Sequence, residues 1–192
     1  MFKQKGLLDS GLLNYKGVHN VLEIGLGTGL NALLTLLEAD KHRNRIYYTA
    51  LEPYPLETPI TESLNYCELL NAPAYQKRFE KIHNCPWEEM IEISEFFRLT
   101  KKKCRLQDYS SNEVFSLVYY DAFAPSAQPE LWTREIFEKL LSMMLPESVL
   151  VTYCSKGDVR RAMQAAGFIV EKLPGPPGKR EILRAVKPQP KV

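Results

Sequence analysis

Three glycines at alternate positions follow an apolar run in the segment LEIGLGTGL, residues 22–30. Glu23 lies near the end of that run, and Gly25, Gly27 and Gly29 lead into a segment with a helical pattern. Glycines let a chain turn sharply, expose its N–H groups and leave no side chain where a flat or anionic ligand would approach. We therefore predict that a nucleoside-bearing cofactor lies against this turn.

Two further acidic residues are placed to complete such a site. Glu52 ends the apolar run YYTALE, where a carboxylate can accept hydrogen bonds from both ribose hydroxyls. The alternative is that Glu52 caps a helix that begins after Pro53. Asp108, in the loop LQDYS, is expected beside the adenine, with Tyr109 available for stacking. Asp108 could instead start a turn before residues 110–112.

A third carboxylate, Asp121, ends a buried run in VFSLVYYDAFAPSAQPELW, residues 114–132. A carboxylate at the carboxyl end of a central parallel strand faces the ligand crevice. Pro125 stiffens the loop that follows. Phe123 and Trp132 could present aromatic faces to a base or to a sulfonium group, although each is more often a core residue.

These residues need a parallel sheet to bring them together, and the pattern of the chain predicts one. Short β-rich runs alternate with longer helical segments, which indicates an α/β fold with helices on both faces of a mostly parallel sheet. The expected seven strands are His19–Ile24, Arg45–Leu51, Lys103–Leu106, Val114–Tyr120, Ser148–Tyr153, Phe168–Leu173 and Glu181–Val186. The expected helices are Leu30–Ala39, Pro55–Asn71, Pro86–Thr100, Pro129–Met144 and Lys156–Ala165.

Two shorter segments complete this expectation. LPGPPGKR, residues 173–180, is too short to hold a crossover helix, so the last two strands should form an antiparallel hairpin. The run of lysines at 101–103 is interpreted as the solvated C-terminal end of a helix.

Length and composition set the remaining bounds. A chain of 192 residues with 45% hydrophobic content predicts a single domain over 1–192, and a net charge of +2 forces neither a nucleic-acid nor a membrane partner. The four cysteines form no CxxC pair, which argues against a zinc site or a disulfide framework. Without a long apolar run or a signal peptide, we expect a soluble, cytoplasmic protein with no membrane partner.

The motifs also carry a family resemblance. The glycine spacing is GxGxG, typical of class I methyltransferases, rather than the GxGxxG of dinucleotide-binding folds, because Leu30 stands where the third glycine would be. LEIGLGTGLNALL, ALEPYPL, YYDAFAPSAQPELWT and AGFIVEKLPGPPGKREILRA together resemble the methyltransferase part of the MnmC family of tRNA 5-methylaminomethyl-2-thiouridine biosynthesis proteins. The resemblance runs from Val21 to Ala185.

The resemblance implies a Rossmann-like class I fold, S-adenosylmethionine as cofactor and the anticodon region of tRNA as substrate. The implied reaction converts 5-aminomethyl-2-thiouridine at the wobble position to 5-methylaminomethyl-2-thiouridine. For that reaction we expect Asp121 to be the catalytic residue, which orients the amine by accepting a hydrogen bond and acts as a general base second. The expected cofactor contacts are Glu23, Gly25, Gly27, Gly29, Asn31, Glu52, Pro53, Asp108, Tyr109 and Asp121. The expected substrate contacts are Phe123, Pro125, Trp132, Lys179 and Arg180.

The chain departs from the family pattern in three ways. Family members carry an N-terminal β-rich stretch, for which only residues 1–20 are present here. Gln128 stands where asparagine is frequent in the DAFAP segment. Bifunctional relatives continue into a flavin-dependent oxidase domain, whereas this chain ends at Val192, so we expect a stand-alone methyltransferase.

Two other functions fit the same motifs. One is a small-molecule N- or O-methyltransferase, which an assay with bulk tRNA lacking the modification would distinguish. The other is a non-catalytic, nucleotide-binding Rossmann-like protein. Loss of S-adenosylmethionine binding on changing Glu52 to Ala would favour the enzymes, whereas binding of NADH instead would exclude them.

Overall fold

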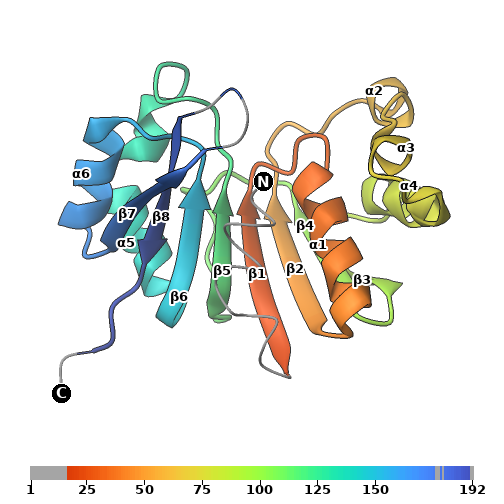
Figure 1. Cartoon of the computed structure of the whole chain (residues 1–192), viewed down its shortest axis with the longest axis horizontal. Coiled ribbons are helices and arrows are strands. Elements are labelled where there is room, and N and C mark those ends of the chain that lie inside the picture. Colours follow the sequence, from red (N-terminus) through yellow and green to blue (C-terminus); the bar gives the residue numbers. More distant parts are fainter. Residues whose placement is uncertain (1–16, 176–177, 179, 191–192) are drawn as a thin grey trace.

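A computed structural model describes residues 17–175, 178 and 180–190 of the chain. In that part, eight strands form one sheet in the order β3-β4-β2-β1-β5-β6-β8-β7, with helices on both faces (Figure 1). The strands are β1 (Val18–Ile24), β2 (Arg45–Leu51), β3 (Met90–Ser94), β4 (Phe97–Lys102), β5 (Phe115–Tyr120), β6 (Met144–Thr152), β7 (Ile169–Pro174) and β8 (Glu181–Val186).

The five central strands, β4, β2, β1, β5 and β6, are parallel, and the sheet is antiparallel at both edges. β3 pairs antiparallel with β4 at one edge. At the other edge β8 lies antiparallel between β6 and β7. The expectation of a mostly parallel sheet with a C-terminal antiparallel hairpin is therefore confirmed.

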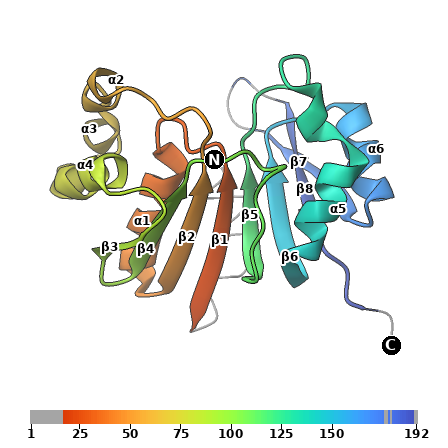
Figure 2. The same cartoon turned by 180° about the vertical axis from the view of Figure 1, so that it is seen from behind.

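Different helices cover the two faces of the sheet. The helical elements are α1 (Leu30–His42), α2 (Thr58–Glu62), α3 (Tyr66–Leu69), the 3-10 turn η3 (Pro73–Tyr75), α4 (Gln76–Asn84), the 3-10 turn η4 (Pro129–Trp132), α5 (Arg134–Ser142) and α6 (Gly157–Ala165). Figure 1 shows α1 in front of the sheet, and Figure 2, from behind, shows α5 across the opposite face.

Alternating residues of the central strands feed two hydrophobic cores. Along β1, Val21 joins the core that packs against α1 and α4, and Leu22 joins the core that packs against α5 and α6. A strand buried on both faces is expected for parallel sheets covered by crossover helices. This packing fixes the positions of the carboxyl ends of β1, β2 and β5.

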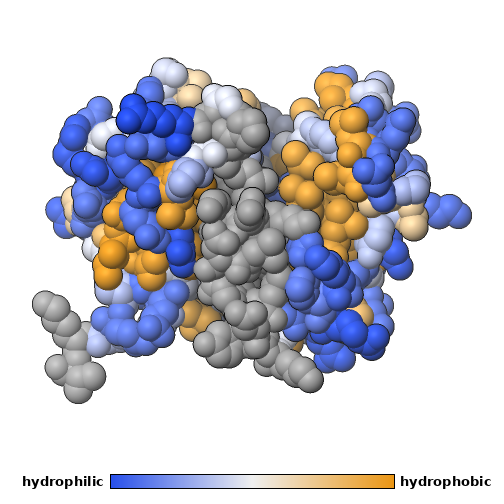
Figure 3. Space-filling model, viewed as in Figure 1, coloured by the Kyte–Doolittle hydropathy of each residue, from blue (hydrophilic) through white to orange (hydrophobic). Residues whose placement is uncertain are grey.

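Some hydrophobic residues remain exposed on the surface of the molecule. In the view of Figure 3, hydrophobic residues gather over α1 and over β7 and β8, where the Ile169 side chain is 63% exposed. Within the described residues, none of the helices combines the length and the apolar character that crossing a membrane requires.

Several expected elements are wrong. The segment expected as the helix Pro86–Thr100 instead forms most of the β3–β4 hairpin, because its apolar residues alternate with polar ones and so suit a strand. The expected strand Lys103–Leu106 is a loop. The sheet accordingly has eight strands rather than seven.

The helix boundaries also differ. The segment Pro55–Asn71 holds two short helices, α2 and α3, rather than one long helix. The segment Pro129–Met144 contains η4 and α5, and Met144 already begins β6. Helix α4 was not expected, although its strong amphipathic pattern buries Phe79 and Ile82.

Lys101 overturns the interpretation of the lysine run as a solvated helix end. It lies in β4, its side chain is 1% exposed, and its Nζ donates a hydrogen bond to the carbonyl of His83. The Nζ atom also lies 4.7 Å from the ring centroid of Trp87. Burial lowers the pKa of the Lys101 ammonium group.

Candidate active site

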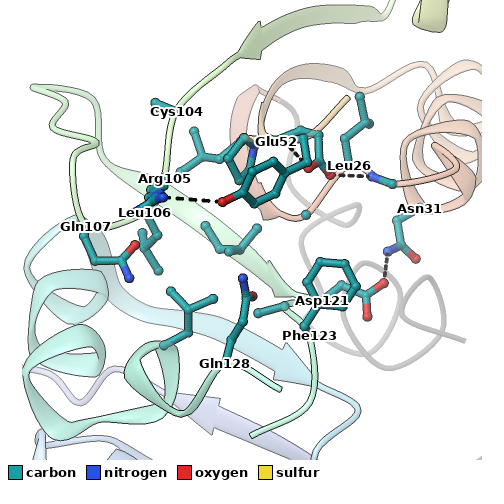
Figure 4. A pocket seen from close by; sticks show the side chains of 18 of the residues that line it. Leu26, Asn31, Glu52, Cys104, Arg105, Leu106, Gln107, Asp121, Phe123 and Gln128 are labelled. Carbon is teal, nitrogen blue, oxygen red and sulfur yellow. Dashed lines mark hydrogen bonds between the residues drawn. The ribbon is translucent and has the colours of Figure 1, made fainter. Parts of the chain in front are cut away.

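A cavity of about 580 Å³ opens at the carboxyl ends of β1, β2 and β5 (Figure 4). Its volume lies within the range of about 300–1,000 Å³ that is usual for small-molecule sites. The chain continues from β1 to β2 on one side and reaches β5 on the other, so this is the point where strand order reverses. Ligands of open parallel sheets bind at such a switch point.

The three glycines of the β1–α1 turn all have positive φ but meet different surroundings. A Cβ atom on Gly25 would lie 2.9 Å from the carbonyl oxygen of Asp121, so a side chain there would force the chain away from β5. A Cβ atom on Gly27 would meet no atom within 4 Å, and this residue lines the cavity. A Cβ atom on Gly29 would instead lie 3.1 Å from Nε2 of the His83 ring, and Gly29 does not line the cavity. The bare backbone beside the cavity is therefore at Gly25 and Gly27.

Glu52 closes one wall of the cavity. Its Oε2 accepts from the backbone N–H of Gly27 at 3.0 Å, and its Oε1 accepts from the N–H of Tyr54 at 2.9 Å. The next helix begins only at Thr58 and its N-cap is Glu57, so Glu52 does not cap a helix and the capping alternative is wrong. A carboxylate has lone pairs for further acceptor bonds beyond these two. Glu52, only 8% exposed, is thus held in place and can still accept from a ligand.

Asp121 and Asn31 form another part of the cavity wall. The Asn31 Nδ2 donates to Asp121 Oδ2 at 3.2 Å and to Glu23 Oε1 at 2.9 Å (Figure 4 shows the first of these bonds). Asn31 and Asp121 line the cavity, whereas Glu23 is fully buried and does not. Burial raises the pKa of the Glu23 carboxyl to about 8, and the hydrogen bond from Asn31 only partly offsets this.

The loop after β4 places its residues differently from expectation. Asp108 is exposed and lies off the cavity, and Tyr109 is 7% exposed within the core that packs on α5. The reason is that β4 ends at Lys102 and the chain then turns, with the N–H of Tyr109 donating to the carbonyl of Arg105 at 3.1 Å. The cavity wall is made here by residues that the sequence did not single out, namely Cys104, Arg105, Leu106 and Gln107.

The loop after β5 forms the outer edge of the cavity. Phe123 lines it with a side chain that is 65% exposed, and Gln128 lines it too. Trp132, expected as a substrate contact, is buried against Tyr120 and Phe137 and does not line the cavity. Trp132 follows the loop after β5, and the sequence does not show that its ring packs into the core rather than toward the ligand.

The remaining expected residues are spread out. Pro53 lines the cavity, as expected, whereas Pro125 does not. Arg180 is exposed and lies off the cavity, and Lys179 lies outside the described residues. Sequence reasoning also missed other residues of the wall, among them Tyr54, Glu130, Leu131 and Tyr153.

Within the described residues, no group of three or more histidine, cysteine or acidic side chains could hold a metal ion. All four cysteine thiols are free. The polar side chains that line the cavity instead include three carboxylates, three amides and one guanidinium group, and the apolar side chains of Leu51 and Leu106 line it too. These polar residues are Glu52, Asp121, Glu130, Asn31, Gln107, Gln128 and Arg105. This combination suits a flat nucleoside that carries a positive charge.

Comparison with known proteins agrees with this chemistry. Residues 105–188 match the family model described as S-adenosyl-L-methionine-dependent methyltransferase. Over 183 residues the chain is 30% identical to the tRNA 5-methylaminomethyl-2-thiouridine biosynthesis bifunctional protein MnmC of Leptospira interrogans, serovar copenhageni. The match covers 88% of this chain and 27% of that protein, so the chain spans about a quarter of the length of such curated relatives.

Solved structures share the fold. MnmC2 from Aquifex aeolicus superimposes with a TM-score of 0.67 at 21% identity, covering 94% of this chain and 56% of that one. The N-methyltransferase NodS from Bradyrhizobium japonicum WM9, in complex with S-adenosyl-L-homocysteine, gives a TM-score of 0.50 at 16% identity and covers 95% of this chain and 84% of that one.

The fold and the matched family define an S-adenosyl-L-methionine-dependent methyltransferase, and S-adenosylmethionine is its cofactor. Within that class the chain is similar to the methyltransferase region of MnmC, as its motifs indicated.

Proposed function

We propose that this methyltransferase acts on the exocyclic amine of 5-aminomethyl-2-thiouridine at the wobble position of tRNA, and that its product is 5-methylaminomethyl-2-thiouridine. The observation that carries the proposal is the Asp121 carboxylate, held by Asn31 at the wall of the cavity and followed by the exposed ring of Phe123. The resemblance to the methyltransferase region of MnmC supports the choice of substrate.

The cofactor site in this proposal combines the β1–α1 turn with Glu52. Gly25 and Gly27 offer bare backbone, Glu52 accepts from the ribose hydroxyls, and Pro53 shields that wall. Leu106 and Gln107 take the adenine end that the sequence assigned to Asp108 and Tyr109. When bound, S-adenosylmethionine supplies a methyl group activated by a positively charged sulfur.

Asp121 then acts on the acceptor. It receives a hydrogen bond from the amine and so aligns the nitrogen lone pair, and such alignment alone can supply several kcal/mol of the barrier reduction. A carboxylate also attracts the ammonium form, which opposes loss of the proton that the reaction requires. Orientation is therefore its first role, and proton transfer is its second.

Phe123 is the proposed contact for the uracil ring. A base must leave its stack to reach an enclosed site, and RNA-binding proteins receive such bases on aromatic side chains. Phe123 meets this need because it is exposed and belongs to the cavity edge. Lys179 and Arg180, expected from the GKRE motif, remain candidates for phosphate contacts, so tRNA binding should weaken by about tenfold or more when salt rises from 50 to 200 mM.

The decisive experiment is mass spectrometry of tRNA nucleosides after incubation with the protein and isotopically labelled S-adenosylmethionine. We expect 5-aminomethyl-2-thiouridine to gain one methyl group, and Asp121→Asn to reduce the rate by about tenfold or more. Asp108→Asn is the matched control, because that carboxylate lies off the cavity and its removal should leave the rate unchanged. Methylation of small amines with no methylation of tRNA would overturn the proposal.

A further inference from the structure

Glu23 is an acidic residue that the proposed mechanism has not used. It is the sixth residue of β1, and its side chain is fully buried on the sheet face that α1 covers. It does not line the cavity, although the sequence placed it among the cofactor contacts. Its connection to the site runs through one group, the side-chain amide of Asn31 at the start of α1.

The side-chain amide of Asn31 donates hydrogen bonds to two carboxyl groups. A single nitrogen, Nδ2, lies 2.9 Å from Glu23 Oε1 and 3.2 Å from Asp121 Oδ2. An amide nitrogen carries two hydrogens, so one can serve each carboxyl group. With both used, the Asn31 side chain cannot rotate without losing both bonds. The position of Asp121 therefore depends on an acceptor that lies one layer behind the cavity wall.

The charge of Glu23 matters to the same site. Its second oxygen, Oε2, is buried and meets no donor at good hydrogen-bond geometry among the described residues, so an ionised carboxylate there is costly. The neighbouring Tyr48 hydroxyl favours the ionised form but offsets the cost of burial only in part. The titratable groups around it are Tyr48 from β2, Tyr119 from β5, Asp121 after β5 and Glu52 after β2. The two acids oppose ionisation of Glu23, and burial opposes it most strongly.

We propose that Glu23 is a positioning residue for methyl transfer, which holds Asp121 through Asn31 and which must be protonated for the site to work best. This inference rests on the proposed role of Asp121. Protonated Glu23 accepts the Asn31 hydrogen bond without adding a second negative charge behind Asp121. Ionised Glu23 would place a second negative charge behind Asp121 and would favour the ammonium form of the incoming amine, which cannot attack.

The first test compares Glu23→Leu with Glu23→Gln. Leucine removes the acceptor, and we expect kcat to fall by about tenfold or more, while the dissociation constant of S-adenosylhomocysteine changes by less than about threefold. Glutamine keeps an acceptor oxygen without a charge, so it should restore most of the lost kcat at pH 7. Its kcat relative to the wild type should rise above pH 8, where Glu23 ionises.

Glu38→Gln is the matched control. Glu38 is another buried carboxyl group, 3% exposed, which lies on α1 and does not line the cavity. Its substitution should leave the kcat ratio independent of pH. Equal losses of kcat in Glu23→Leu and Glu23→Gln, or wild-type kcat in a folded Glu23→Leu protein, would overturn the inference.

A second test needs no tRNA and separates this inference from the proposed function. The side-chain amide of Asn31, assigned in ¹⁵N NMR spectra by its loss in Asn31→Leu, should shift with pH with a midpoint near 8. The shift should vanish in Glu23→Gln and persist in Glu38→Gln. An amide that does not titrate, or that titrates alike in Glu23→Gln, overturns the coupling. If the coupling holds but tRNA is not methylated, the proposed function fails and the coupling stands.

Discussion

Trp132 donates its indole N–H to the backbone carbonyl of Phe123 at 2.9 Å, and so ties the buried aromatic core to the exposed loop at the cavity edge. The indole packs edge-on against Tyr120, with ring centroids 5.0 Å apart. Tyr120 ends β5, so the loop is fixed relative to the strand that precedes Asp121. The aromatic residue that the sequence assigned to the substrate thus supports the one that is exposed.

Trp132→Phe should therefore impair the use of tRNA more than binding of the cofactor. The variant loses one hydrogen bond, worth about 0.5–1.5 kcal/mol, and keeps most of the packing. We expect kcat/KM for tRNA to fall about threefold to tenfold, with the dissociation constant of S-adenosylhomocysteine unchanged. Trp87→Phe is the control, because Trp87 is half-buried and does not line this cavity. Equal effects of the two substitutions would argue against a role for the Trp132 bond.

Glu52→Ala should weaken cofactor binding without unfolding the protein. Hydrogen bonds to a charged group contribute about 1.5–3 kcal/mol, so isothermal calorimetry should show a loss of about 10- to 100-fold in affinity for S-adenosylhomocysteine. Glu57→Ala is the matched control, because Glu57 is exposed at the start of α2 and makes no capping hydrogen bond. Unchanged affinity in Glu52→Ala would remove Glu52 from the site.

Gly27→Ala and Gly29→Ala should differ in what they damage. Both residues have positive φ, at 50° and 71°, so each alanine carries a backbone cost of about 1–2 kcal/mol. The methyl group at position 27 enters open space beside the cavity, whereas the one at position 29 meets the ring of His83. Affinity for S-adenosylhomocysteine should therefore fall more in Gly27→Ala, and the melting temperature should fall more in Gly29→Ala. The reverse order would contradict this assignment.

Glu23 should make the stability of the protein depend on pH. Its pKa is raised from 4.5 to about 8 by folding, so the unfolded chain releases this proton at lower pH than the folded protein does. The contribution of the protonated group is complete below pH 4.5 and is lost as pH rises toward 8, by an amount on the order of a few kcal/mol.

Urea unfolding at pH 5 and pH 8 measures this effect. We expect the free energy of unfolding of Glu23→Gln, relative to the wild type, to increase between the two pH values, because glutamine does not titrate. A wild-type protein and a Glu23→Gln variant with parallel pH dependence would show that Glu23 does not titrate in this range.

Local signals in the sequence determined the central part of the molecule. Each of the strands β1, β2 and β5 is an apolar run that is followed directly by a glycine or an acidic residue. These residues are Gly25, Glu52 and Asp121. The short Pro/Gly-rich connection likewise required the antiparallel hairpin of β7 and β8. Such features depend on neighbouring residues, so the amino-acid order alone specifies them.

Only the tertiary structure decided which side chains meet. The bond from Asn31, which also serves Glu23, to Asp121 joins residues 90 positions apart in the chain. The choice of Gln107 over Asp108 depends on where β4 ends, and a shift of one residue turns a different side chain toward the cavity. Lys101 is buried because α4 and Trp87 cover it, which no pattern in its own lysine run reveals. Local propensity fixes elements, whereas long-range packing and desolvation fix the site.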